Sequence, residues 1–184
     1  MRFYIILYLL VFVLSCNIFH PRDSEEPSKP PEWNIITNTA DRCLENLLFV
    51  YNYKQNAINY HRILSDQFTF NFDLQDVQDF GVPVVWGKQQ EIEMLINLHQ
   101  YSNKYQDIFL YLEQVPNQTD NYGATSVTFF RNYILRIDSL NKTLKGRFQL
   151  LVEKDTDGLW RIKTWHDYRI NDIWTWGRLK DEFG

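Results

Sequence analysis

Asp155-Thr156-Asp157-Gly158-Leu159-Trp160-Arg161-Ile162 is the most informative stretch of this 184-residue chain. Its first four residues are typical of a tight hairpin turn, because aspartate and glycine accept the backbone angles that such turns require. Apolar and β-branched residues recur on both sides, over 143–154 and 159–168. The stretch therefore predicts two antiparallel strands joined by a short turn.

Two more strands precede this hairpin. Residues 105–115 and 124–138 are rich in aromatic and β-branched side chains, and the polar segment 117–123 ends in a glycine between them. Asn141-Lys142 then separates the second of these strands from the strand at 143–154. Four strands joined by short loops predict an antiparallel meander.

An aromatic strand and three helices are expected before the meander. Phe68, Phe70 and Phe72 alternate with polar residues, and this period of two predicts a strand with one apolar face. The segment 74–85 is expected to be a connection. Apolar residues at steps of three and four predict three helices: Ala40, Cys43, Leu44, Leu47, Leu48 and Tyr51 in the first, which Thr37, Asn38 or Thr39 can cap; Ala57, Tyr60, His61 and Leu64 in a short second helix ending near Ser65-Asp66; and Ile92, Leu95, Ile96 and His99 in the third, over 88–102.

The predicted fold class is α+β, with a curved antiparallel sheet wrapped around three N-terminal helices and a short C-terminal helical extension. With this order of elements, Trp86-Gly87 before the third helix and the hairpin at 155–162, residues 37–168 resemble the nuclear transport factor two-like superfamily. The resemblance implies a cone, the fold of ketosteroid isomerase, scytalone dehydratase and polyketide cyclases. Because the superfamily includes enzymes, ligand carriers and interaction modules, it does not specify a chemistry.

His166 is the candidate catalytic residue. Strict alternation from Trp160 would place Ile162, Thr164, His166 and Tyr168 together on the concave face. A histidine near the open end of a cone can act as a general base around neutral pH. The alternative is a hydrogen-bonded residue at the rim.

Other side chains could line the same pocket. Arg131 alternates with apolar neighbours, so it is either a buried ligand-binding cation or a side chain that extends to solvent. The full set of pocket candidates is Tyr60, His61, His99, Arg131, Trp160 and Thr164.

Isomerase chemistry of the ketosteroid type requires a carboxylate base, a tyrosine and a protonated carboxylic acid. Asp73 and Asp76 lie near the first strand, but Asp73 alternates away from its aromatic face, and no acidic residue is expected on the inner face of the last strand. The four histidines show no metal-ligand spacing, and the chain has no glycine-rich phosphate loop. We therefore expect neither a metal nor a cofactor.

The first sixteen residues predict where the protein is located in the cell. Met1-Arg2 is followed by an apolar run from Phe3 to Leu14 and by Ser15-Cys16, which resembles a bacterial lipoprotein signal peptide. The run is shorter than the ~20 residues of a spanning helix. We expect residues 1–15 to be removed and Cys16 to be lipidated, which would anchor the chain to the membrane in the cell envelope. An ordinary secretory signal or an uncleaved anchor are the alternatives.

The remaining chain divides into three segments. Residues 16–32 contain Pro21, Pro27, Pro30 and Pro31 among polar residues, which predicts a disordered tether. The cone domain is expected over 33–170. Residues 171–184 form a tryptophan-rich extension, which we expect to pack on the domain rather than to expose a binding patch.

The charge and cysteine content exclude some classes of function. The formal net charge is −4, without a basic stripe, which argues against a nucleic-acid partner. The chain has two cysteines; if Cys16 carries the lipid, Cys43 has no intramolecular partner and is expected in the core.

Three functions agree with these observations. The first is a non-catalytic lipoprotein that binds a small apolar ligand or a protein partner through its cone. The second is an isomerase, dehydratase or cyclase that uses His166. The third is a module that forms homodimers through its sheet face. A roomy pocket would favour binding or catalysis, whereas a filled concavity would favour the interaction role.

Overall fold

A curved sheet of seven strands forms the framework of the computed structural model, which describes residues 32–102, 107–170 and 174–184. The strands are hydrogen-bonded in the order β2-β1-β7-β6-β5-β3, and β4 pairs with β5. Their bounds are β1 Leu64–Asn71, β2 Val85–Gly87, β3 Ile108–Gln114, β4 Asn121–Tyr122, β5 Ser126–Ile137, β6 Lys142–Lys154 and β7 Trp160–Arg169.

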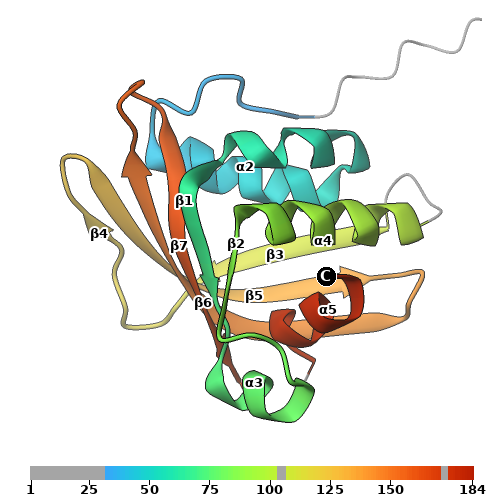
Figure 1. Cartoon of the computed structure of the whole chain (residues 1–184). Helices are drawn as coiled ribbons and strands as arrows, with labels where there is room; N and C mark the ends of the chain where they lie inside the picture. Colours follow the sequence, from blue (N-terminus) through green and yellow to red (C-terminus); the bar gives the residue numbers. More distant parts are fainter. Residues whose placement is uncertain (1–31, 103–106, 171–173) are drawn as a thin grey trace, which may run out of the picture. The chain divides into compact units, whose positions relative to one another are not determined.

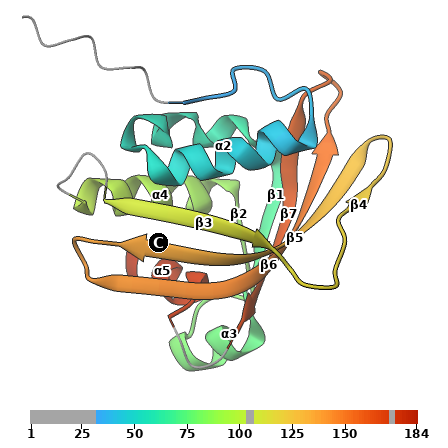
Figure 2. The same cartoon turned by 180° about the vertical axis from the view of Figure 1, so that it is seen from behind.

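Five helices complete the described chain. They are α2 Ala40–Asn52, the 3₁₀ helix η2 Lys54–Arg62, α3 Leu74–Phe80, α4 Lys88–Tyr101 and α5 Trp176–Phe183. Figures 1 and 2 show α2 and α4 over the concave side of the sheet, with α5 on the same side, over β5 and β6. Within the described residues, none of these helices has the length and apolar character needed to cross a bilayer.

The predicted α+β cone is confirmed. The strands β3, β5, β6 and β7 form the expected antiparallel meander, and Thr39 caps α2 by accepting a hydrogen bond from the Arg42 N–H. The aromatic strand β1 adds to the meander beside β7, and this pair is parallel rather than antiparallel. The sheet is curved but not closed, because β2 and β3 lie at its two ends.

Two local predictions were wrong. The connection 74–85 contains the helix α3, which Asp73 caps at its start and Gly81 ends with a left-handed φ of 71°. The short second helix ends at Arg62 rather than near Ser65-Asp66, because β1 already begins at Leu64. Both helices are too short for apolar periodicity to locate them.

The face assignment along β7 was also wrong beyond Ile162. Ile162 pairs with Val152, but Thr164 pairs with Leu151, so Lys163 is an extra residue on β7. Such a bulge reverses the alternation that follows it. Trp165 and Asp167 consequently point into the cone, whereas Thr164, His166 and Tyr168 lie on the opposite face.

Candidate functional site

The interior of the cone is occupied by the chain's own C-terminal segment. Trp176 is completely buried; its indole N–H donates to the Tyr51 hydroxyl, and its backbone N–H donates to the Tyr133 hydroxyl. Leu179 and Phe183 belong to the same core. Residues 174–184 therefore pack within the domain and take the space in which we expected a ligand.

A buried ion pair links α5 to α4. The Lys180 ammonium group donates to the Glu91 carboxylate at 2.5 Å, and neither side chain is exposed. The Trp86 indole N–H donates to the same carboxylate oxygen (Oε2) at 2.9 Å, and the Tyr60 hydroxyl donates to the other oxygen (Oε1) at 2.8 Å. Burial lowers the pKa of Lys180, and the charge of Glu91 partly opposes this shift.

A second buried carboxylate holds the start of α5. Thr175 caps α5, and its hydroxyl donates to Asp76 at 2.6 Å. Arg169 at the end of β7 contacts both Asp76 and Asp79. Burial raises the pKa of Asp76, while the bond from Thr175 lowers it. These contacts attach the C-terminal segment to α3 and β7.

Asp167 is the acidic residue that sequence analysis did not expect on the inner face. Burial raises its pKa to about 8, and the charge of Asp76 acts in the same direction, while Lys180 and the Tyr133 hydroxyl favour the ionised form. Within the described residues, neither Asp167 carboxylate oxygen has a hydrogen-bond partner of regular geometry. Asp167 is therefore protonated at neutral pH.

His166 does not face the cone interior. It lies on the outer face of β7, paired in register with Gln149 and Asn71, and its ring lies 6.5 Å from that of Tyr168. Partial burial lowers its pKa. Its position opposite to the concave face removes the geometric reason for a catalytic role.

The two histidines among the predicted pocket residues also lie in different parts of the structure. His99 is buried, and its Nε2 contacts the Val50 carbonyl at 2.8 Å. Burial lowers the pKa of His99, and the charge of Lys54 acts in the same direction. His61 lies on the surface, where its Nδ1 contacts the Ile58 carbonyl.

The remaining candidates have structural roles. Arg131 forms a two-pronged ion pair with Asp120, with both contacts at 2.6 Å. Trp160 is buried and faces inward as predicted, whereas Thr164 lies on the outer face. Tyr60 reaches the interior, but its hydroxyl is bound to Glu91. The structure thus does not gather the predicted set into one pocket.

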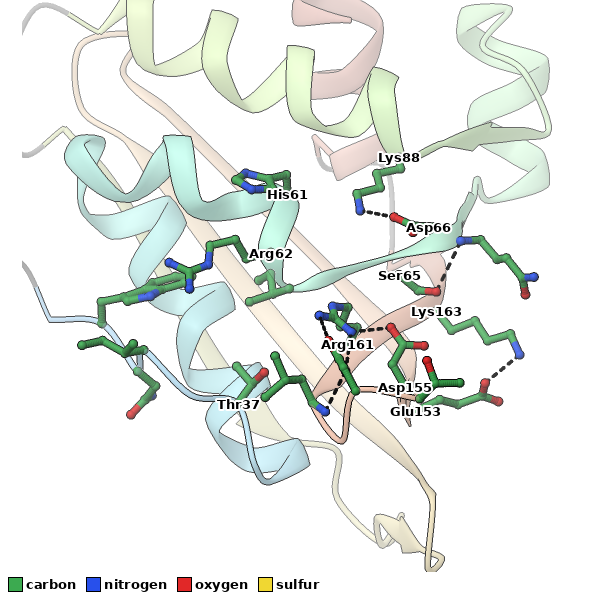
Figure 3. Close-up of a pocket in the computed structure, with 18 residues that line it drawn as sticks. Thr37, His61, Arg62, Ser65, Asp66, Lys88, Glu153, Asp155, Arg161 and Lys163 are labelled. Atoms are coloured by element: carbon green, nitrogen blue, oxygen red, sulfur yellow. Dashed lines mark hydrogen bonds and ion pairs between the residues drawn. The ribbon is translucent and has the colours of Figure 1, made fainter.

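An open groove of about 620 Å³ lies outside the cone, between η2, β1 and β7 (Figure 3). A break in sheet pairing forms it. Leu64 pairs with Ile162 and Thr69 with Thr164, so the described register gives residues 65–68 no partner in β7. Lys163, the bulged residue of β7, lines the groove at the same level, together with residues 33–35 and Thr37 of the N-terminal segment.

Charged side chains line this groove. Lys88 pairs with Asp66, and Lys163 pairs with Glu153, as Figure 3 shows. Arg161 binds both Asp155 and Asp157, each at 2.6 Å. Its bond to Asp157, together with the Leu159 N–H, lowers the pKa of Asp157 to about 2. Each of the four groove carboxylates therefore has a cationic partner.

Arg62 is a further cationic side chain of the groove, and His61 lies beside it. Both side chains are exposed at the end of η2, and within the described chain no ion pair involves Arg62. This edge can accept an anionic group, because its guanidinium is not neutralised by a neighbouring carboxylate. Within the same residues, no cluster of three or more histidine, cysteine or acidic side chains could hold a metal ion.

Of the pocket residues predicted from the sequence, His61 lines the groove and the others do not. Charged residues on strand ends and turns resemble ordinary surface residues, and the missing β1–β7 pairs leave no mark in composition. The buried residues Glu91 and Lys180 were missed for a related reason, since charged side chains are almost never fully buried unless they are paired. Their separation of 89 residues hides that pairing.

Comparison with known proteins supports the fold. No protein-family model and no curated protein matches the chain. Among solved structures, it is similar to a candidate calcium/calmodulin-dependent protein kinase type II association domain from Thiobacillus denitrificans, with 10% identity and a TM-score of 0.54, covering 75% of this chain and 100% of that chain. It is also similar to a candidate aromatic ring hydroxylase from Novosphingobium aromaticivorans, with 11% identity and a TM-score of 0.52, covering 72% and 87%.

A third similar structure is a protein of unknown function with a cystatin-like fold from Nostoc punctiforme, with 8% identity and a TM-score of 0.51, covering 72% of this chain and 90% of that chain. These likenesses support the predicted cone fold. At such identities they show the fold alone.

Proposed function

We propose that this chain is a lipid-anchored protein of the bacterial cell envelope whose cone domain binds a small polar ligand without catalysing a reaction. One observation carries the binding part of this proposal: the C-terminal segment fills the cone, whereas the groove beside β1 and β7 is open and lined by charged side chains. An apolar ligand in the concavity would have to displace Trp176. The proposal is therefore a polar ligand in the groove instead of the expected apolar ligand in the cone.

The groove suits a ligand that carries an anionic group. Arg62 and His61 would bind this group at the end of η2, while the paired acids and bases along β6 and β7 would contact other polar atoms. The unpaired stretch of β1 adds backbone groups that the sheet does not use. Catalysis is not part of the proposal, because His166 lies on the outer face of the sheet.

Binding is tested by native mass spectrometry of the purified chain. We expect a small molecule to co-purify with the wild-type protein and to be lost in Arg62→Glu. The matched control is Arg42→Glu on α2, whose side chain is exposed and contacts Asn38 away from the groove. Retention of the same molecule in Arg62→Glu, or its loss in both variants, would refute the groove as the binding site.

The lipid anchor is supported by the signal-like segment that ends at Cys16. We expect the wild-type chain to incorporate labelled fatty acid and to fractionate with membranes. Cys16→Ser should lose the label and appear in the soluble fraction, whereas Cys43→Ala should keep both properties because Cys43 is buried in the core. Membrane association of Cys16→Ser without label would identify an uncleaved anchor instead.

A further inference from the structure

The ammonium group of Lys180 lies in a cage of aromatic rings. Its Nζ atom is 4.0 Å from the ring centre of Phe70, 5.0 Å from that of Trp86 and 5.5 Å from that of Trp165. These rings come from β1, β2 and β7. The negative face of an aromatic ring attracts a lysine ammonium group, and cages of several such faces are used to recognise quaternary ammonium ligands.

The cage has an anionic wall that is also fixed by other elements. The Glu91 carboxylate on α4 binds Lys180, Tyr60 of η2 and Trp86 of β2. The bonds from Tyr60 and Trp86 do not involve α5, so they can hold the carboxylate in place whatever occupies the cage. The site is therefore built by the cone, and Lys180 is the group that enters it.

Stability alone does not require an ammonium group at this position. A buried ion pair contributes little compared with apolar side chains of the same volume, because both charges lose their hydration. Leu179 and Phe183 already attach α5 to the core. An arrangement of three ring faces and one oriented carboxylate around a single cation is the chemistry of a receptor for that cation.

We propose that the interior of the cone is a binding site for a primary ammonium group, and that Lys180 occupies it as a ligand tethered to the C-terminal helix. The site is distinct from the groove: its walls are Phe70, Trp86, Trp165 and Glu91, none of which lines the groove. Its ligand class is a primary alkylamine in its protonated form.

Removing the tethered group tests this site. In the full chain, Lys180→Ala deletes a propylammonium-sized part of the side chain and leaves Trp176, Leu179 and Phe183 to hold α5. We expect n-propylammonium chloride to raise the melting temperature of Lys180→Ala by about 3 °C or more at saturation, in a concentration-dependent way. n-Propanol and sodium chloride at the same concentrations provide the uncharged and the ionic comparison.

Two control variants make the result specific. Lys180→Met fills the cage with an uncharged chain of similar length, and Lys145→Ala removes an exposed lysine from β6. Neither variant should respond to n-propylammonium more than the wild type does. An equal response of Lys180→Ala to n-propanol, or no response beyond that of Lys145→Ala, would overturn the proposal.

If Lys180→Ala does not fold by itself, the refolding yield gives the same comparison. Recovery of folded protein with n-propylammonium but not with n-propanol supports an ammonium site. Failure of both additives, or equal recovery with both, rejects it. The double variant Arg62→Glu/Lys180→Ala should respond to n-propylammonium as strongly as Lys180→Ala does. This comparison separates the ammonium site from the proposed groove ligand.

Discussion

The indole rings of Trp176 on α5 and Trp165 on β7 pack edge to face, with their centres 4.6 Å apart and their planes at 87°. Both rings are fully buried, and Trp165 reaches this position only because the bulge at Lys163 turns it inward. The contact makes the C-terminal segment part of the hydrophobic core. It also explains why the concavity of this cone is filled.

Replacing Trp176 by alanine should lower the free energy of unfolding by about 3–5 kcal/mol, because it removes a large buried aromatic side chain and leaves a cavity. The hydrogen bond to Tyr51 is lost as well. Urea unfolding measures the change. Trp174→Ala is the matched control, since that ring is partly exposed and lies against Arg178 and Lys142. A loss below about 1 kcal/mol for Trp176→Ala would contradict its central role.

The main elements of the fold could be predicted because their signals are local. The alternation of Phe68 and Phe70 identifies β1, and the apolar stripe that contains Cys43 and Leu47 identifies α2. The turn at 155–158 places β6 and β7 side by side, and the structure confirms this pairing. Each of these signals depends on residues that are close in sequence, so it can be recognised without knowledge of the tertiary structure.

The candidate site could not be predicted, because it depends on irregular features. A bulge inserts one residue without a sequence mark of its own, so simple alternation placed His166 inside the cone and Trp165 outside. The groove also arises where β1 leaves β7. Lys180 stands beside Asp181 and Glu182 in the sequence, and only the tertiary structure brings it to Glu91.

Gly146 should not tolerate a side chain. It lies opposite Tyr133 in the β5–β6 register, and the Cβ atom of an alanine would overlap the Tyr133 ring and hydroxyl. We expect Gly146→Ala to lower the free energy of unfolding by about 1–3 kcal/mol through overpacking. Denaturant unfolding provides the measurement. Gly87→Ala is the comparison, because its Cβ would meet only the Gln90 side chain at 3.7 Å. Equal effects of both substitutions would argue against this close packing.

His99 should make the fold sensitive to acid. Its pKa is lowered, mainly by burial, so the unfolded chain takes up a proton at a higher pH than the folded chain does. The stability that neutral His99 contributes is present above pH ~6.5 and is lost as the pH falls toward its folded pKa. His99→Gln should therefore lose less stability than the wild type between pH 7 and 5 in urea titrations. His61→Gln, at an exposed position, is the control; if both variants follow the wild-type profile, His99 is not the responsible group.

Asp167 should produce a pH dependence of the opposite sign. Its folded pKa of about 8 lies above its ordinary value of 3.8, so the folded chain keeps a proton that the unfolded chain releases. The stabilising contribution of the protonated acid is complete below pH ~4 and is lost progressively as the pH rises to about 8. Asp167→Asn keeps a neutral group of the same shape at every pH. At pH 7.5 it should be at least about 1 kcal/mol more stable than the wild type, and near pH 4 the difference should disappear. Urea unfolding at a series of pH values measures both effects, with the exposed Asp181→Asn as the control. A constant difference between pH 4 and 8 would mean that Asp167 does not carry a proton inside the cone.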